Sequence, residues 1–274
     1  MRFRLPLLLA AATLLAGCFQ IDAVLTVRPD GSAELRETAS ANGLFGFALH
    51  QAARELAPGA DRSDVHGDGV TVRSVETSTA PGRAVVTTVY DIADVSAFRY
   101  DLTESGLMAG DGNPLVTTGG TDAPDGDAPD GDAAAPDASS FRFRVAPGAD
   151  GDASRLVVTV PAGADFPDAD DFRGLEMLGL RPEGDVPSFQ DMMVLMGDAR
   201  LRFAIRAASI EDADAGWHDG DTVTLTDIDL GVFLEYLVET GATPETLAAD
   251  DPAHGVALPG YRTAPAGAAT ILFR

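Results

Sequence analysis

A single cysteine, Cys18, limits how this chain of 274 residues can be stabilised. One thiol cannot form an intrachain disulfide, a cysteine-rich zinc site or a dithiol redox pair, so the fold must depend on packing and hydrogen bonds. Before Cys18, Arg2 and Arg4 precede an uninterrupted apolar or small stretch from Leu5 to Gly17. That stretch is shorter than the ~20 residues of a membrane-spanning helix. The pattern therefore predicts a signal peptide over residues 1–17.

The signal sequence ends in Leu15-Ala16-Gly17-Cys18, which resembles the lipobox of bacterial lipoproteins. In that family the cysteine is diacylated, the preceding peptide is cleaved, and the new N-terminus is acylated as well. The resemblance implies that Cys18 carries fatty acyl chains such as palmitate and anchors the mature chain to a membrane. The alternative is a buried or free thiol after an ordinary secretory signal. An exported protein has little other use for one unpaired thiol.

The sequence after Cys18 indicates on which side of the membrane the lipid-anchored domain lies. No segment after Cys18 is apolar for long enough to cross a bilayer, so we expect a globular body on the exported side of a bacterial envelope membrane. Phe19 follows the cysteine, where some lipoproteins carry an Asp that retains them in the inner membrane. This favours the outer membrane in a bacterium with two membranes.

The charge balance excludes several kinds of function. There are 43 acidic and 19 basic residues, a formal net charge of -24 and 45% hydrophobic residues, so we expect a sizeable core and no nucleic-acid partner. Every basic residue is Arg, which excludes a Walker P-loop, a Schiff-base lysine and a Ser-x-x-Lys acylase. The acidity fits either a surface adapted to high salt or a soluble envelope protein from a GC-rich genome.

Apolar and polar residues alternate in several segments, which predicts half-buried strands. These strands are expected near residues 21–27, 33–35, 69–76, 83–92, 141–145, 156–160, 201–206 and 268–273, with a further strand after 219–221. A turn is expected at Pro29-Asp30-Gly31. Helices are expected after three capping residues, Asn42, Ser188 and Asp229. The helix after Asp229, residues 230–239, is apolar around nearly its whole circumference, so it should be buried or line an apolar site.

Residues 110–140 show no such alternation and consist largely of Asp, Gly, Ala and Pro. Such a segment has too little apolar surface to offset its ordering entropy, which predicts a disordered acidic loop. For residues 18–274 we predict one α+β domain, with a mixed, mainly antiparallel sheet built from hairpins and a few packed helices. The closing strand near 268–273 is expected to place both ends of the mature domain in one sheet.

Two stretches are similar to LppM-type bacterial lipoproteins. The segment from Ile21 to Ala33, close behind Cys18, looks like the opening of that domain. The segment from Leu201 to Leu230 is similar to its later strands. The resemblance implies a mixed sheet with helices and an envelope role involving lipid or glycolipid contact, and it supplies no catalytic residue. Members of that family commonly add a C-terminal transmembrane helix, whereas this sequence stops at Arg274.

Motifs for catalysis or metal binding are missing from the sequence. The histidines His50, His66, His218 and His254 are far apart, and no pair has the spacing of a metal site. There is no Gly-x-Ser-x-Gly elbow and no dinucleotide-binding glycine motif. A dispersed Ser/His/Asp hydrolase site is the enzyme alternative. Asp-Gly-Asp turns offer oxygen ligands for Ca²⁺ but complete no twelve-residue loop. We therefore expect no metal, no cofactor and no enzymatic activity.

Two sets of residues are candidates for ligand contact. Arginines on the polar faces of two strands could hold phosphate or carboxylate groups, or could instead form cross-strand pairs with the abundant acids. These are Arg142, Arg144, Arg200, Arg202 and Arg206. Apolar side chains on the two later helices could line a hydrophobic ligand site, or could simply fill the core. These are Met192, Met193, Met196, Phe233, Tyr236 and Leu237.

The sequence thus predicts a lipid-anchored envelope protein whose domain is a non-catalytic binding or assembly module, with a lipid or glycolipid as the expected ligand. One alternative is a structural subunit that binds a protein partner in an envelope complex, which predicts a flat exposed apolar patch. The other is the hydrolase, which predicts a cleft where a histidine meets a serine or an acid.

Overall fold

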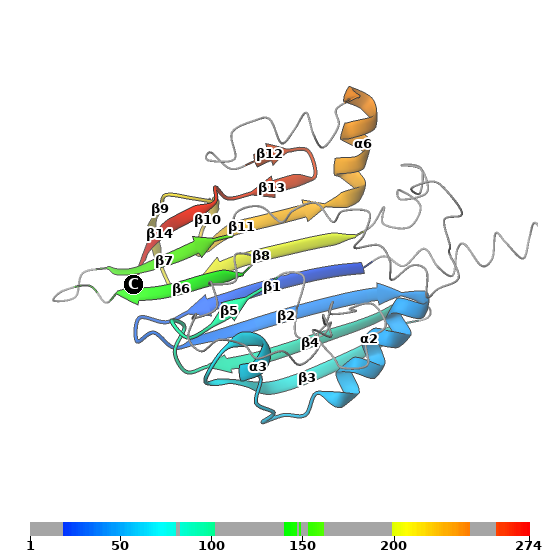
Figure 1. Cartoon of the computed structure of the whole chain (residues 1–274), viewed down its shortest axis with the longest axis horizontal. Coiled ribbons are helices and arrows are strands. Elements are labelled where there is room, and N and C mark those ends of the chain that lie inside the picture. The colour runs from blue at the N-terminus through cyan, green and yellow to red at the C-terminus, as the bar shows by residue number, and fades with distance from the viewer. Residues whose placement is uncertain are drawn as a thin grey trace, which may run out of the picture.

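The computed structural model describes residues 19–80, 83–101, 140–146, 148, 153–161, 199–241 and 256–274. Within these ranges the chain forms two β-sheets with a few helices packed against them (Figure 1). This confirms the predicted α+β class built mainly from antiparallel hairpins. In the same ranges, no helix is long and apolar enough to cross a membrane.

The first sheet has nine strands in the order β12-β13-β11-β8-β1-β2-β4-β3, with β10 paired to β11. They are β1 Phe19–Val27, β2 Ala33–Asn42, β3 Val70–Ala80, β4 Arg83–Ile92, β8 Arg200–Arg206, β10 Trp217–Asp219, β11 Thr222–Asp229, β12 Val256–Leu258 and β13 Tyr261–Thr263. The second sheet has the order β5-β6-β7-β14-β9. Its strands are β5 Arg99–Tyr100, β6 Phe141–Ala146, β7 Ser154–Val160, β9 Ile210–Ala213 and β14 Gly267–Phe273. The helices are α2 Gly43–Glu55, α3 Ser63–His66 and α6 Leu230–Thr240.

The predicted hairpins β1–β2, β3–β4 and β6–β7 are all confirmed as antiparallel pairs. In the β1–β2 turn, Asp30 accepts a hydrogen bond from the Ser32 backbone N–H at 2.9 Å, and Gly31 adopts a φ of 84°. An L side chain rarely adopts that φ, which explains why glycine follows the Pro-Asp pair.

One pairing joins distant parts of the chain. β1 lies between β2 and β8, and it runs parallel to β8 with Gln20 opposite Arg200 and Thr26 opposite Arg206. Because this pair is parallel and the other described pairs are antiparallel, the first sheet is mixed, as predicted. It makes β1 a central strand of the first sheet.

The prediction that both ends of the mature domain share one sheet is wrong. β1 belongs to the first sheet, whereas β14 lies between β7 and β9 in the second. The alternating pattern correctly predicts which face of β14 is buried, since Ala269, Ile271 and Phe273 are all buried. Alternation identifies the face of a strand but not its neighbour, and β14 pairs along its whole length with β7.

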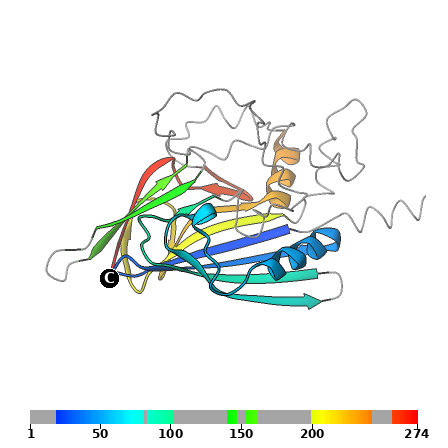
Figure 2. The same cartoon turned by 60° about the horizontal axis from the view of Figure 1, so that its bottom comes forward.

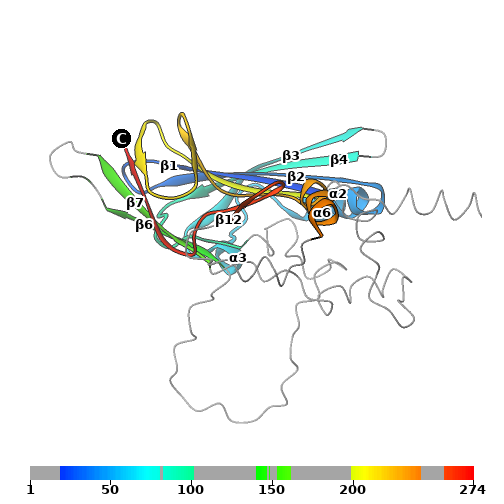
Figure 3. The same ribbon diagram turned by 90° about the horizontal axis from the view of Figure 1, so that it is seen from above.

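The main core lies between the sheets. Figures 2 and 3 show the second sheet inclined over one end of the first sheet, and Phe141, Phe203 and Phe273 are among the fully buried side chains there. The other end of the same face is covered by α2, whose Leu49 and Ala53 pack on a separate cluster. Burial of aromatic side chains contributes a large share of the hydrophobic stabilisation of such a core.

The helix α6 begins as predicted, because Asp229 Oδ1 accepts a hydrogen bond from the Val232 N–H at 3.1 Å. Asn42 occupies the expected N-cap of α2, but its side chain makes no capping hydrogen bond. The expectation that α6 is buried or lines an apolar site around most of its circumference is wrong in part. Phe233 and Leu237 are buried, whereas Val232 and Val238 are 45% and 59% exposed.

Two predicted elements lie outside the described residues. These are the acidic loop predicted over residues 110–140, of which only Ser140 is described, and the helix after Ser188 with its three methionines.

Candidate anion-binding site

Two arginines lie side by side on the short strand β5 and on β6. Arg99 pairs with Arg142, and Tyr100 pairs with Phe141. Tyr100 and Phe141 are 0% and 2% exposed and point into the core, so the alternation of a strand turns both arginines to the outside. The register that buries the two aromatic rings therefore places Arg99 and Arg142 opposite each other on neighbouring strands, with both side chains on the outer face. Like charges opposite each other in a sheet are destabilising unless something neutralises them.

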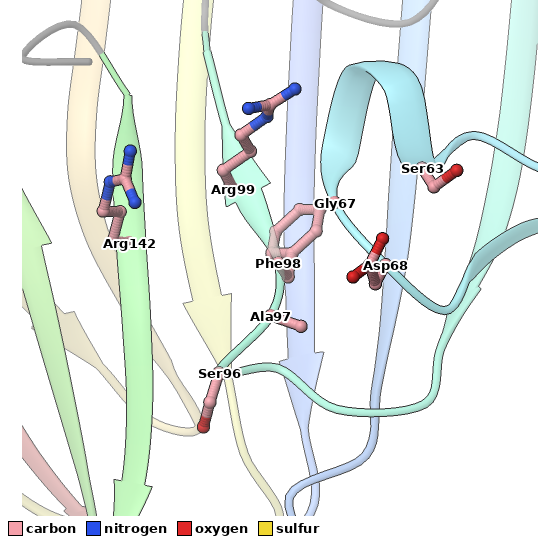
Figure 4. Close-up of a pocket in the computed structure, with 8 residues that line it drawn as sticks. All are labelled: Ser63, Gly67, Asp68, Ser96, Ala97, Phe98, Arg99 and Arg142. Atoms are coloured by element: carbon pink, nitrogen blue, oxygen red, sulfur yellow. The ribbon is translucent and has the colours of Figure 1, made fainter. Parts of the chain in front are cut away.

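These arginines border a pocket of about 300 Å³, named here the arginine pocket. Its lining residues are Ser63, Gly67, Asp68, Ser96, Ala97, Phe98, Arg99 and Arg142. Figure 4 shows Arg142 on one side of Phe98 and Arg99, with Asp68 and Ser63 on the other side. The pocket lining thus includes two cations, and on the side away from Arg142 it includes a serine and a carboxylate.

Arg99 is held in place by the short helix α3. Its Nη2 donates to the backbone carbonyl of Asp64 at 2.6 Å, and its Nε donates to that of Val65 at 3.1 Å. Arg142 has no carboxylate partner among the described residues, and the same holds for Arg99. Arg83 and Arg144 also lack a carboxylate partner among the described residues, so what distinguishes Arg99 and Arg142 is that they face each other across paired strands at one pocket.

The three candidate arginines of β8 are engaged differently. Arg200 makes two hydrogen bonds of 3.0 Å to the carboxylate of Asp227. Arg202 and Arg206 lie 3.0 and 3.4 Å from Asp22 and Asp221, respectively. They thus form the cross-strand pairs that the sequence offered as the alternative to ligand contact. Exposed pairs of this kind contribute little stability.

Arg144 lies two residues beyond Arg142 on the same exposed face of β6. It is not among the residues that line the arginine pocket. The structure therefore brings only Arg142, of the five predicted arginines, together with Arg99. Sequence reasoning missed Arg99.

Behind the pocket, His66 of α3 is 1% exposed. Its ring lies 5.1 Å from the ring of Tyr90, 5.8 Å from Phe98 and 6.1 Å from Tyr100, measured between centroids. Burial lowers the pKa of His66 to about 4, and the positive charge of Arg62 acts in the same direction. His66 is therefore neutral at pH 7 and acts as an aromatic wall that supports the pocket.

None of the described histidines is arranged for acid-base chemistry. The ring nitrogens of His66 have no hydrogen-bond partner, and His218 Nε2 lies 2.8 Å from the carbonyl oxygen of Gly220. His50 Nδ1 is buried and also lacks a partner. His254 lies outside the described residues. In the described ranges no three His, Cys, Asp or Glu residues gather as a metal-binding group.

The six residues predicted to line an apolar ligand site fall into two groups. Met192, Met193 and Met196 lie outside the described residues. Phe233 and Leu237 are buried in a small cluster with Leu258 and Tyr261, which Tyr236 joins as a partly buried member. The rings of Phe233 and Tyr261 are 5.0 Å apart. In the described part of the chain, these residues pack α6 against β12 and β13.

No protein-family model matches the chain, and no curated protein sequence matches it. Among solved structures, the chain is similar to the NMR structure of the folded domain of Mycobacterium tuberculosis LppM, at 12% sequence identity and a TM-score of 0.28. The similarity covers 78% of this chain and 84% of that domain. Because the TM-score is so low, the resemblance to LppM-type lipoproteins stays a prediction from the sequence.

Proposed function

We propose that this protein is a lipid-anchored lipoprotein of a bacterial envelope and that its domain binds an anionic ligand at the arginine pocket without transforming it. The observation that carries the proposal is the adjacent pair Arg99 and Arg142, which has no carboxylate partner in the described ranges. The β8 arginines, by contrast, each have a partner. The pocket therefore has two cations on its border that no described carboxylate neutralises, and Arg99 is held in position by its hydrogen bonds to α3.

The chemistry of the pocket indicates the ligand class. Two arginines on neighbouring strands match a phosphate or a carboxylate, which can accept hydrogen bonds from both. The side away from Arg142 offers the carboxylate of Asp68 and the hydroxyl of Ser63, which suit hydroxyl groups on the same ligand. A phosphorylated polyol or sugar has both features, either free in solution or as the headgroup of a lipid or glycolipid.

A binding role suits the pocket better than a catalytic role. No hydrogen bond joins the pocket serines to a histidine among the described residues, and His66 is buried behind the wall with its pKa lowered to about 4. The arginines remain charged at any working pH, so they can hold an anion but cannot exchange protons with it.

The anchor is the second part of the proposal. Cys18 is the only cysteine and directly precedes β1, so acylation there attaches the folded domain to the membrane at a defined strand end. Intact-mass analysis of the protein from a bacterial host tests this part. An N-terminal Cys18 with acyl mass supports it, and an uncleaved chain in both wild type and Cys18→Ser contradicts it.

Calorimetric titration tests the pocket, with inorganic phosphate, a phosphorylated polyol and a short-chain phospholipid as separate probes. Arg142→Gln removes one charged donor and should weaken binding of the preferred probe by about tenfold or more. Arg144→Gln is the matched control, because it makes the same charge change on the same strand outside the pocket. Equal weakening by both variants would show that the effect is general electrostatics and would refute the site. Comparing the probes separates a free phosphate from a lipid headgroup.

A further inference from the structure

Both long helices begin at the same end of the first sheet as β1. Phe19 pairs with Ala41, two residues before α2 begins. On the other side of β1, Gln20 pairs with Arg200, which in turn pairs with Asp229, the N-cap residue of α6. Figures 1 and 3 show this arrangement, with α2 and α6 on the same face of the sheet and near opposite edges. We call this region the helical end of the domain.

The exposed large hydrophobic side chains of the described residues all lie on these two helices. Phe47 of α2 is 63% exposed, and Val232 and Val238 of α6 are 45% and 59% exposed. Single exposed apolar residues are common on soluble proteins, but two of these three, Phe47 and Val232, lie at the same end of the domain, which indicates a contact surface. Phe47 and Val232 lie within the first two turns of their helices, close to the start of β1.

The length of chain before β1 identifies the partner. Cys18 is the residue immediately before Phe19, so acylation of Cys18 leaves no linker between the acyl chains and the first strand. One residue spans at most ~3.6 Å, so the start of β1 must lie at the depth of the lipid headgroups. This step rests on the proposed acylation. A domain held so closely brings the helical end into contact with the bilayer.

We propose that the helical end docks on the surface of the anchoring membrane, with Phe47 and Val232 inserted among the lipids. The acyl chains then fix the position of the domain, and the two side chains fix its orientation. Apolar side chains at such an interface add to the anchoring energy in proportion to the area that they bury.

The charges at this end are compatible with lipid contact. Arg83 donates hydrogen bonds to Gln20 Oε1 at 3.2 Å and to Ser40 Oγ at 2.8 Å, and it has no carboxylate partner in the described part of the chain. It therefore offers a cation to lipid phosphates beside the start of β1. Glu235 and Glu239 are exposed further along α6. These acids favour water, which limits the contact of α6 to its first turn.

The test uses the acylated full-length protein, purified from a bacterial host and placed in vesicles of phosphatidylethanolamine with a minority of phosphatidylglycerol. Acylated Cys18 has no free thiol, so an introduced cysteine is a unique labelling site. A fluorescent dye at Gln51→Cys reports on the exposed side of α2, and Ala93→Cys places the same dye beyond the opposite end of the sheet. A nitroxide lipid in the vesicles quenches a dye that approaches the bilayer.

We expect several times more quenching at position 51 than at position 93. Adding Phe47→Ser and Val232→Ser should lower the quenching at position 51 markedly but not to the level at position 93, because the acyl anchor still holds the start of β1 at the headgroups. Positions 47 and 232 are exposed, so these changes should leave the fold intact. Equal quenching at the two positions, or quenching unaffected by the two changes, overturns the docking. Intact mass separates the two proposals. A protein without acyl chains overturns both, whereas an acylated protein with equal quenching overturns the docking alone.

Discussion

The buried histidine His66 should make the stability of the domain depend on pH. Its pKa is about 4 in the folded protein, against 6.5 for an unperturbed histidine. Because the folded pKa is the lower one, the unfolded chain binds the proton more readily below pH 6.5, and protonation favours unfolding. The contribution is fully present above pH 6.5 and is lost as the pH falls toward 4. Between pH 8 and pH 5, this group alone should reduce the free energy of unfolding by about 2 kcal/mol.

Urea denaturation at a series of pH values measures this effect, on the protein expressed from residue 18 with Cys18→Ser. In His66→Phe the ring remains aromatic and stays between Tyr90 and Tyr100, but it cannot take up a proton. Its free energy of unfolding should fall about 2 kcal/mol less than that of the wild type over the same pH range. His218→Phe makes the same change at an exposed site and controls for the substitution itself. The carboxylates are the same in all three proteins, so a difference between wild type and His66→Phe in how the free energy of unfolding depends on pH comes from His66. The same pH dependence in both proteins would refute the reasoning.

Two further predictions concern packing. Gly260 has a φ of 71°, and a Cβ there would lie 2.3 Å from the backbone nitrogen of Phe233, so Gly260→Ala should cost about 3 kcal/mol or more in urea denaturation. Gly220→Ala, with a φ of 62° and open space around the Cβ, should cost only about 1 kcal/mol. Phe203→Ala should cost about 3–5 kcal/mol in the same assay, because its ring lies 4.7 Å from those of both Tyr100 and Phe141 at the centre of the core.

The hairpins could be predicted because their signals are local. Alternating residues fix which face of a strand is buried, and turn residues such as Pro29 and Gly31 fix where the chain reverses. The parallel pairing of β1 with β8 and the place of β14 depend on contacts between distant segments, which a single sequence does not encode in its spacing. The exposure of Val232 has a related cause, since a helical pattern shows which residues are apolar but not which side the sheet covers.

The arginine pocket shows the same division between local and distant information. Arg142 was a sequence candidate because it lies in an alternating strand, but its partner Arg99 is on a strand of two residues with no periodicity to detect. A signal is nevertheless present. Residues 98–100 read Phe-Arg-Tyr and residues 141–143 read Phe-Arg-Phe. An arginine between two aromatic residues, repeated in two segments, has the pattern of paired strands whose rings pack inward and whose cations meet on the surface.

The pocket and the proposed membrane contact lie toward opposite ends of the first sheet, which restricts how a ligand arrives. Val95 N–H donates to the carbonyl of Gly31 in the β1–β2 turn at 2.9 Å, so the adjoining pocket residues Ser96 and Ala97 lie near that turn. Acylated Cys18 instead adjoins the start of β1, at the far end of the same strand. A headgroup still embedded in the anchoring bilayer would have to cross the length of β1 to reach Arg99 and Arg142. The geometry therefore favours a ligand that approaches from the aqueous side, either free or already extracted from a membrane. A soluble phosphorylated polyol should accordingly bind the anchored protein at least as well as the same headgroup presented in the vesicles that carry it, which calorimetric titration of the vesicle-bound protein measures.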